Sequence, residues 1–336
     1  MANNYCSPLE ITQIEHNFSE INPALTAAEA MHEANRCLFC YDAPCIQACP
    51  TGIDVPSFIK KIATGNLHGS ARVIFDANPI GASCARVCPV EVLCEGACVE
   101  KTLLQKPIEI GRLQRHATDY AMSNGRQIYT KGESNGKSVG IVGSGPAGLS
   151  CATYLARLGY AVTVYEQKAM AGGLDTYGMA EYKMPQSVSL SEVEHIKKIG
   201  VEFLTNTEIV ADADTRGHGD AVSVSEPGAI ATGSTVEFSE LEKQYDAIFL
   251  AIGLGETNKL NIPGEDLDGV YDALDFIEKI KTRDWKSVPL GKTVAVIGAG
   301  NTAIDSRRGQ SAGPGAKRGQ APQLFRALHH IWLLYT

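Results

Sequence analysis

Residues Cys37–Cys98 decide the fold, because this stretch holds eight of the chain's ten cysteines in two blocks. The first block reads CLFCYDAPCIQACP from Cys37 to Pro50, and the second reads CARVCPVEVLCEGAC from Cys84 to Cys98. Thiolates at such short spacing are typical of iron–sulfur proteins, where a short segment aims several sulfurs at one compact inorganic core. The two blocks therefore predict two iron–sulfur clusters.

Two other roles are open for these thiols. A zinc ion would suit the pair Cys37 and Cys40, but the uneven gaps between the other cysteines fit a tetrahedral four-thiolate site poorly. Disulfides are the second alternative. The chain opens MANN, without a basic segment followed by an apolar one, so we expect a cytoplasmic protein in a reducing compartment, where structural disulfides are rare.

The composition restricts the class of protein. A length of 336 residues predicts two or more domains. The formal net charge of −8 argues against a nucleic-acid partner. No apolar run approaches the roughly 18 residues that a membrane-spanning helix needs, so we expect no membrane segment.

Residues 1–125 are expected to form a small all-α domain, of the ferredoxin-like α-helical kind, around the cysteines. In residues 54–63 the apolar residues Val55, Phe58, Ile59 and Ile62 fall on one helical face. The apolar core is thin, so metal coordination would supply much of the ordering free energy. The expected helices are Ala24–Asn35, Asp54–Ala63, Leu67–Ala77 and Pro107–Met122.

After an expected polar linker at 126–137, residues 138–290 predict an α/β Rossmann-type domain that binds FAD. A short apolar strand, Ser138–Val142, leads into a glycine-rich turn, a helix at Leu149–Leu158 and a second strand that ends at Glu166. Strand, turn, helix and terminal acidic residue are the context that a dinucleotide fingerprint requires, with the acidic side chain on the ribose. The turn consists of Gly143, Ser144, Gly145, Pro146, Ala147 and Gly148.

The fingerprint alone does not distinguish FAD from NAD, but two other segments favour FAD. Gly172, Gly173 and Leu174 follow the second strand closely, and Tyr245–Gly253 resembles the strand that returns beneath the flavin in flavoproteins with two dinucleotide-binding domains. An ordinary buried strand that ends at a glycine turn is the alternative interpretation of Tyr245–Gly253.

Residues 291–305 are expected to begin a nested α/β domain for NAD(P)H. A strand at Gly291–Ile297 would lead into a second glycine-rich turn, although a purely structural turn is the alternative. In residues 306–323, glycines and prolines should prevent a helix from continuing. We therefore expect residues 306–336 to be an aberrant or frameshifted tail. The turn consists of Gly298, Ala299, Gly300, Asn301 and Thr302.

Three runs carry a resemblance to a known family: residues 36–50 with the first cysteine block, CARVCP at 84–89 and IGRLQR at 110–115. They resemble the N-terminal half of dihydropyrimidine dehydrogenases, most of all the separate flavin and iron–sulfur subunit of the bacterial two-subunit enzyme. The small subunit of glutamate synthase is similar in architecture. The resemblance extends from about residue 20 to Asp305.

The resemblance implies two [4Fe–4S] clusters with interleaved ligands. One would be held by Cys37, Cys40, Cys45 and Cys98, and the other by Cys49, Cys88, Cys94 and Gln114. Cys84 would then be a spare thiol. Without the resemblance, Gln114 would be interpreted as an amide on the surface of a helix.

For the dinucleotides, the resemblance carries over to Ser144–Gly148, Glu166, Gly172–Leu174 and Ala299–Thr302. It also includes Lys183, where arginine is more usual, so a phosphate contact there would lack the bidentate fork.

The implied function is electron input. NAD(P)H would reduce FAD, and electrons would pass through the clusters to a catalytic, FMN-type dihydropyrimidine dehydrogenase subunit that reduces uracil or thymine. No catalytic acid, base or nucleophile is expected in this chain. A glutamate synthase small subunit and a non-catalytic fragment that only binds clusters and FAD are the alternatives.

Overall fold

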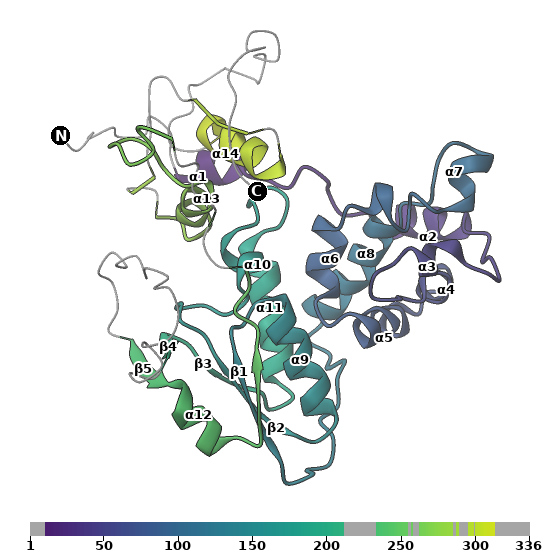
Figure 1. Cartoon of the computed structure of the whole chain (residues 1–336). Coiled ribbons are helices and arrows are strands. Elements are labelled where there is room, and N and C mark those ends of the chain that lie inside the picture. Colours follow the sequence, from purple (N-terminus) through teal and green to yellow (C-terminus); the bar gives the residue numbers. More distant parts are fainter. Residues whose placement is uncertain are drawn as a thin grey trace. The chain divides into compact units, whose positions relative to one another are not determined.

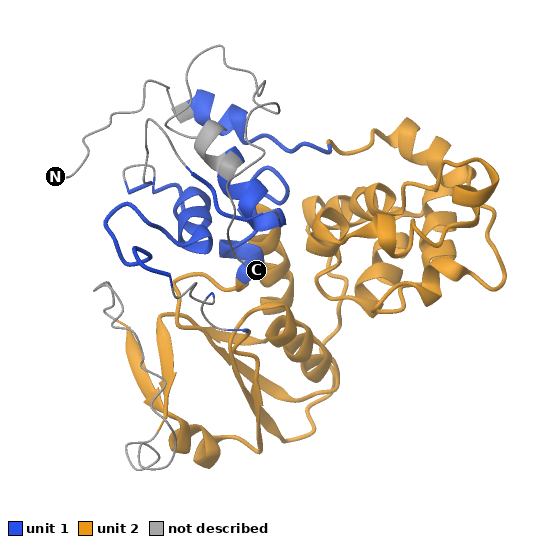
Figure 2. Cartoon of the chain, turned by 45° about the horizontal axis from the view of Figure 1, so that its top comes forward, with its two compact units in different colours: residues 1–22, 174–186, 254–336 blue, residues 23–173, 187–253 orange. Residues whose placement is uncertain are grey.

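The computed structural model describes residues 11–211, 233–254, 257, 262–284, 287–288, 295–298 and 300–312. They belong to two compact units, shown in different colours in Figure 2. The larger unit consists of residues 23–173 and 187–253, and the smaller unit draws on residues 1–22, 174–186 and 254–336. No helix in the described ranges is both long and apolar enough to cross a membrane.

The larger unit begins with helices that the sequence predicted. Three of the four predicted helices begin at side-chain caps, which satisfy backbone N–H groups that have no partner within the helix. Thr26 forms a capping box with Glu29, and Asp54 accepts a hydrogen bond from the backbone nitrogen of Ser57. The four longer helices are α2 (Ala27–Asn35), α4 (Val55–Ala63), α5 (Leu67–Ala77) and α8 (Ile110–Ser123). The short ones are α3 (Pro44–Gln47), α6 (Gly81–Val87), the 3₁₀ turn Val90–Val92 and α7 (Val99–Leu103).

These helices pack around an apolar core of their own. Phe58 and Ile59 of α4 and Leu113 of α8 are fully buried in it. The predicted apolar face of α4 is therefore confirmed, since Val55 and Ile62 are buried as well. Five cysteines of the two blocks pack against or within this core, so the helical core and the thiols form one structure.

A parallel sheet follows in the larger unit (Figure 1). Its strands lie in the order β3 (Glu202–Leu204), β2 (Ala161–Tyr165), β1 (Ser138–Val142) and β6 (Ala247–Leu250). Helices α9 (Pro146–Arg157) and α11 (Gln186–Lys197) contribute to the buried core of this sheet. Because parallel strands end at the same edge, the glycine-rich turn after β1 and Glu166 after β2 are brought side by side. A two-stranded parallel sheet, β4 (Thr207–Val210) with β5 (Ser234–Glu237), and helix α12 (Phe238–Gln244) complete the unit.

The helices and the sheet share a second core. Phe75 and Ala82 from the helices belong to the same buried cluster as Ile141 and Val164 from the sheet. Residues 126–137, expected as a polar linker, join this core. Tyr129 is 3% exposed, and its hydroxyl donates to the carbonyl oxygens of Phe75 and Pro79 at 3.4 and 3.3 Å. The segment is thus packed between the two parts rather than looping free of them.

The smaller unit contains α1 (Ile11–Asn17), α10 (Leu174–Tyr177), α13 (Ala273–Lys281) and α14 (Asn301–Ala312). Its core joins distant segments of the chain, with Ile14 and Phe18 packed in a cluster with Phe276 and Ile280. The sequence analysis named neither α1 nor α13, although the apolar residues of α13, with Phe276, Ile277 and Ile280 buried, follow helical spacing.

Two expectations near the second glycine-rich turn need correction. The prediction that no helix continues past Ser306 was wrong, because α14 runs to Ala312 and includes Gly309. One glycine inside a helix costs only about 1 kcal/mol relative to alanine, which neighbouring turns can offset. The strand expected at Gly291–Ile297 is absent from its described part, where residues 295–297 have no regular structure. Residues 291–294 lie outside the described residues, as do 313–336.

A buried lysine organises the smaller unit. The side chain of Lys281 is fully buried, its ammonium donates to the carbonyl oxygen of Met184 at 2.6 Å, and it lies 3.3 Å from a carboxylate oxygen of Glu181. Asp175, 5% exposed, belongs to the same group. Burial raises the pKa of Asp175 to about 6, although the charge of Lys281 acts in the opposite direction.

Asp175 should make the stability of the smaller unit depend on pH. Its pKa is about 6 in the folded chain and about 3.9 in an unfolded one, so the folded state binds the proton more tightly. Its contribution to the free energy of unfolding is therefore complete below about pH 4 and is lost as the pH rises through about 6. Asp175→Asn should remove this loss and gain up to about 3 kcal/mol relative to wild type at pH 7.

Urea unfolding between pH 4 and 7 measures this difference. Asp268→Asn is the matched control, because Asp268 is exposed in the same unit. If wild type and Asp175→Asn lose stability in parallel over that range, Asp175 is not the titrating group.

Candidate functional site

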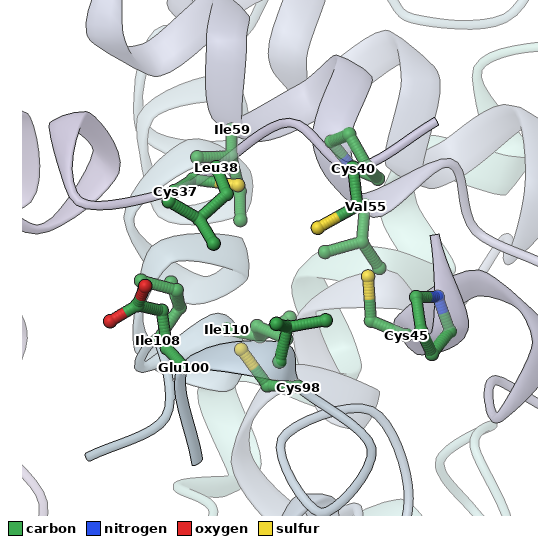
Figure 3. Close-up of a pocket in the computed structure, with 13 residues that line it drawn as sticks. Cys37, Leu38, Cys40, Cys45, Val55, Ile59, Cys98, Glu100, Ile108 and Ile110 are labelled. Carbon is green, nitrogen blue, oxygen red and sulfur yellow. The ribbon is translucent and has the colours of Figure 1, made fainter. Parts of the chain in front are cut away.

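Four cysteines from both blocks line one pocket in the larger unit (Figure 3). Cys37 and Cys40 lie in the turn after α2, Cys45 lies in α3, and Cys98 directly precedes α7. The remaining lining is mainly apolar, with Val55, Ile59, Ile108 and Ile110 among its side chains. These are the four cysteines that the resemblance assigned to one cluster, and the fold brings them together from segments more than fifty residues apart.

The loop that carries three of these thiols has an unusual backbone. Phe39 and Ala43 adopt left-handed conformations, with φ of 51° and 33°. Such conformations cost on the order of 1–3 kcal/mol for residues other than glycine, and they tend to cluster where a site requires a particular chain path. Here they bend the chain between Cys37 and Cys45, so that Cys37, Cys40 and Cys45 all line the same pocket.

Burial makes this pocket unfavourable for free thiolates. It raises the pKa of Cys45 to about 11, and the neighbouring Cys37 and Cys98 add to the effect. The pKa of Cys37 is raised for the same reason. A group of buried sulfurs that repel one another when ionised is matched by positively charged iron, which binds thiolates and releases their protons. The residues therefore fit an iron–sulfur cluster.

Two competing roles for the cysteines receive no support from the geometry. All nine described cysteines are free thiols. Among the described residues, no three His, Cys, Asp or Glu side chains are placed to hold a single metal ion. The thiols of the first pocket stand around a shared space instead of converging on one point, which suits a multi-atom core better than a zinc ion.

A second group of thiols gathers beside α6 and α8. Burial raises the pKa of Cys94 to about 12, and Cys88 and Cys49 are close enough to contribute. Cys84, expected to be a spare thiol, belongs to this group as well. Burial raises its pKa to about 12, Cys88 and Cys49 add to the rise, and a hydrogen bond from Gln114 opposes it.

Gln114 is buried within this second group. Only 5% of the residue is exposed, so the interpretation as an amide on the helix surface was wrong. Its side-chain nitrogen donates to the carbonyl oxygen of Gly81 at 2.8 Å. Helix α8 thus presents the amide toward α6, which carries Cys84 and leads into Cys88.

The glycine-rich turn after β1 is packed too tightly for side chains at two positions. Gly143 has φ of +98°, and a Cβ there would lie 2.3 Å from the carbonyl oxygen of Ala251. A Cβ on Gly148 would lie 2.0 Å from the carbonyl oxygen of Gly143. These contacts show that the chain directly after β6 closes against the turn.

Gly145 differs from its neighbours, because a Cβ there would meet only the Cα of Gly173, at 3.9 Å. This open side is where a pyrophosphate would approach the backbone in a dinucleotide-binding turn. Gly173 has φ of +56°, and the nitrogen of Gly172 donates to the hydroxyl of Ser144 at 3.0 Å. The second glycine segment is therefore held against the first.

Glu166 completes this arrangement at the end of β2. One carboxylate oxygen accepts from the nitrogen of Ser144 at 3.2 Å and from the Ser144 hydroxyl, and the other accepts from the nitrogen of Lys168 at 2.9 Å. The residue is 8% exposed. Its carboxylate thus lies beside the turn and is bonded to Ser144 within it.

The other expected dinucleotide residues belong to the smaller unit. Leu174 begins α10 and is 52% exposed. Lys183, which the resemblance assigns to a phosphate, lies 2.8 Å from a carboxylate oxygen of Asp305 in α14, and the Tyr182 hydroxyl donates to the same carboxylate. The sequence analysis missed Asp305 as a partner, because no local pattern links residues this far apart.

The second glycine-rich turn is described in part. Gly298 has φ of +133°, which suits glycine. Asn301 and Thr302 begin α14, directly after Gly300, while Ala299 lies outside the described residues.

Gly145 and Gly148 offer a test of the first turn. Gly148→Ala should prevent the turn from closing, because the added methyl would collide with backbone. Gly145→Ala should fold normally but bind FAD at least about tenfold more weakly, a loss of about 1.4 kcal/mol, because its methyl would occupy the open side. Circular dichroism and FAD binding to the stripped protein measure the two effects. Unchanged FAD binding by Gly145→Ala would show that the dinucleotide does not approach this face.

Two family models match the chain. Residues 14–126 match a model described as dihydropyrimidine dehydrogenase domain II, 4Fe-4S cluster. Residues 137–306 match the model for pyridine nucleotide-disulphide oxidoreductases. Their common boundary falls in the segment that contains Tyr129.

Two relatives match most of the chain. The chain is 35% identical over 87% of its length to the NAD-dependent dihydropyrimidine dehydrogenase subunit PreT of Escherichia coli (strain K12), and spans 64% of that protein. It is 34% identical over 92% of its length to the glutamate synthase [NADPH] small chain of the same strain, and spans 62% of that protein. Among solved structures, FprA of Mycobacterium tuberculosis in complex with NADPH is 28% identical, covering 51% of this chain and 36% of the other with a TM-score of 0.39.

The matches and the geometry agree on both halves of the larger unit, a helical part that gathers thiols and a parallel sheet with a dinucleotide-binding turn. The chain therefore belongs to the pyridine nucleotide-disulphide oxidoreductase family, and its residues 14–126 match the 4Fe-4S domain of dihydropyrimidine dehydrogenase.

Proposed function

We propose that the chain is the electron-input subunit of a dihydropyrimidine dehydrogenase, which takes electrons from NAD(P)H and delivers them to a partner subunit. One observation carries the proposal: a single compact unit contains two sets of neighbouring cysteines together with a dinucleotide-binding turn. Bound FAD would convert the two-electron chemistry of the nicotinamide into single electrons that the clusters can carry. The chain's own residues would position these groups and exclude water from them.

The first cluster would be held by Cys37, Cys40, Cys45 and Cys98. Their common pocket supports this set, and so does its apolar lining, because exclusion of water is among the factors that tune cluster potentials.

The second cluster would be held by Cys49, Cys88, Cys94 and Gln114. The amide nitrogen of Gln114 donates a hydrogen bond to the carbonyl oxygen of Gly81, so the amide oxygen of Gln114 would be the atom that binds iron. A neutral amide in place of a thiolate would leave this cluster one unit less negative, and net charge is one of the factors that set cluster potentials.

The FAD site of the larger unit would consist of the turn Gly143–Gly148, Glu166 and Gly172–Gly173. Backbone nitrogens at the start of α9 would bind the pyrophosphate. Gly298–Thr302 would bind the pyrophosphate of NAD(P)H. No acid, base or nucleophile is assigned, because the pyrimidine would be reduced on the partner.

The overall reaction would be NAD(P)H, a proton and uracil or thymine giving NAD(P)⁺ and the 5,6-dihydropyrimidine. The two relatives leave glutamate synthesis as the alternative, since the identities of 35% and 34% do not separate them. The family model for residues 14–126 bears the name of dihydropyrimidine dehydrogenase, and Gln114 lies within the GRLQR run, so we favour the pyrimidine assignment.

The cofactor content is the first measurement. The anaerobically purified chain should be brown, with about eight iron and eight sulfide atoms and one FAD per chain, and should reduce an artificial electron acceptor with NAD(P)H. Absence of iron, or zinc in its place, would refute the proposal. Full cofactor content without dye reduction would favour a non-catalytic fragment.

The partner assay then separates the two enzymes. With the catalytic dihydropyrimidine dehydrogenase subunit, NAD(P)H oxidation should depend on uracil. With the glutamate synthase large chain, 2-oxoglutarate plus glutamine should give no oxidation. The reverse result would move the chain to the glutamate synthase assignment.

Gln114 and Cys84 form a matched pair for the second cluster, because both lie in the same thiol group. Gln114→Ala should lose the second cluster's electron paramagnetic resonance (EPR) signal and about half of the iron, whereas Cys84→Ser should keep wild-type iron and both signals. If Cys84→Ser loses the cluster and Gln114→Ala keeps it, the second cluster is held by four thiolates instead.

A further inference from the structure

A buried carboxylate from the sheet reaches the helix beside the second thiol group. Glu192 of α11 is 1% exposed. Its carboxylate accepts from the backbone nitrogens of Ala82 and Ser83 at 2.7 and 3.2 Å, and from the hydroxyl of Ser83. These donors form the first turn of α6, where helical N–H groups have no partner within the helix. Helix α11 of the dinucleotide-binding part thus caps a helix of the thiol-binding part.

Helix α6 is constrained on its other sides as well. At Gly81 an added Cβ would lie 2.6 Å from a methyl of Ile74, so α5 packs closely against its start. Arg86 donates to both carboxylate oxygens of Asp119 in α8, at 2.8 and 2.9 Å. With Glu192 at its first turn, α6 is fixed by three helices, and little freedom remains for a rigid-body shift.

The first turn of α6 is also the turn that holds Gln114. The carbonyl oxygen of Gly81 accepts from the Gln114 amide, and the next two residues donate to Glu192. The other end of α6 leads into Cys88, whose nitrogen bonds back to the carbonyl oxygen of Cys84 at 3.0 Å. A displacement of this turn would therefore move the amide and two thiols of the second group together.

We propose that Glu192 is a positioning residue through which the flavin-binding part sets the geometry of the second cluster, a role that rests on the proposed function above. It acts through the first turn of α6 and through Gln114. Without its carboxylate, two buried N–H groups would lose their acceptor, which is costly enough to rearrange the turn. The first thiol pocket, which contains no residue of α6, should be unaffected.

The test compares Glu192→Ala with Glu192→Gln and Glu194→Ala in the full-length, cluster-loaded chain. Glu192→Ala should shift or broaden the EPR signal of the second cluster and lower iron by up to about half, while the first signal and the FAD content stay at wild-type levels. Glu192→Gln retains an oxygen acceptor and should restore most of the signal. Glu194→Ala, exposed on the same helix, should change nothing.

Ser83→Ala keeps the proposal testable if Glu192→Ala fails to fold, because it removes only the hydroxyl donor. It should shift the midpoint potential or EPR line shape of the second cluster at unchanged iron content. The proposal is overturned if a folded Glu192→Ala chain loses the first cluster signal together with the second, or if neither Glu192→Ala nor Ser83→Ala alters the second signal. Absence of iron from the wild-type chain would refute the proposed function instead, before any variant is compared.

Discussion

The partial burial of neighbouring cysteine thiols is the constraint on which the larger unit depends. Eight sulfurs come from two short stretches, and the fold gathers them into two groups. Each group contains cysteines from both stretches. Burial raises the pKa of Cys45 in the first group and of Cys84 and Cys94 in the second, so thiolates at these positions need positive charge beside them. The helices around them are short, and only a modest apolar core holds them together.

This constraint explains why the helical part does not stand alone. Its second core is shared with the sheet through Phe75, Ala82 and Tyr129, and its helix α6 receives a buried carboxylate from α11. Side chains of the sheet thus satisfy backbone groups of the helical part. Both cofactor-binding parts are held as a single packed body, which suits a protein that must keep redox groups at fixed separation.

Much of this arrangement could be predicted from local patterns. The glycine-rich turn, its flanking strands and the helices α2, α4, α5 and α8 have signals within a few residues of one another, namely caps, apolar periodicity and glycines that no side chain can replace. The grouping of Cys98 with the first block followed from the resemblance alone, since spacing says nothing about which thiols meet.

The remaining contacts could not be predicted because they join distant residues without a local signature. Glu192 bonds Ser83 across more than a hundred positions, and a glutamate on a polar helix is indistinguishable from a solvated one in sequence. The same holds for Lys281 and for the pair Lys183 and Asp305. The expectation at α14 failed for a different reason. A single glycine costs a helix only about 1 kcal/mol relative to alanine, which is too little to end it.

The burial of Tyr129 has a consequence for how this architecture can be recombined. A segment of low regular structure between two cofactor-binding parts would ordinarily be the natural place to cut or splice. Here its tyrosine is hydrogen-bonded to the helical part and packed in a cluster with the sheet. A chimera that joined these helices to a foreign flavoprotein would need residues 126–137 together with the side chains that pack around Tyr129. The two parts are therefore better regarded as one inherited unit than as interchangeable modules.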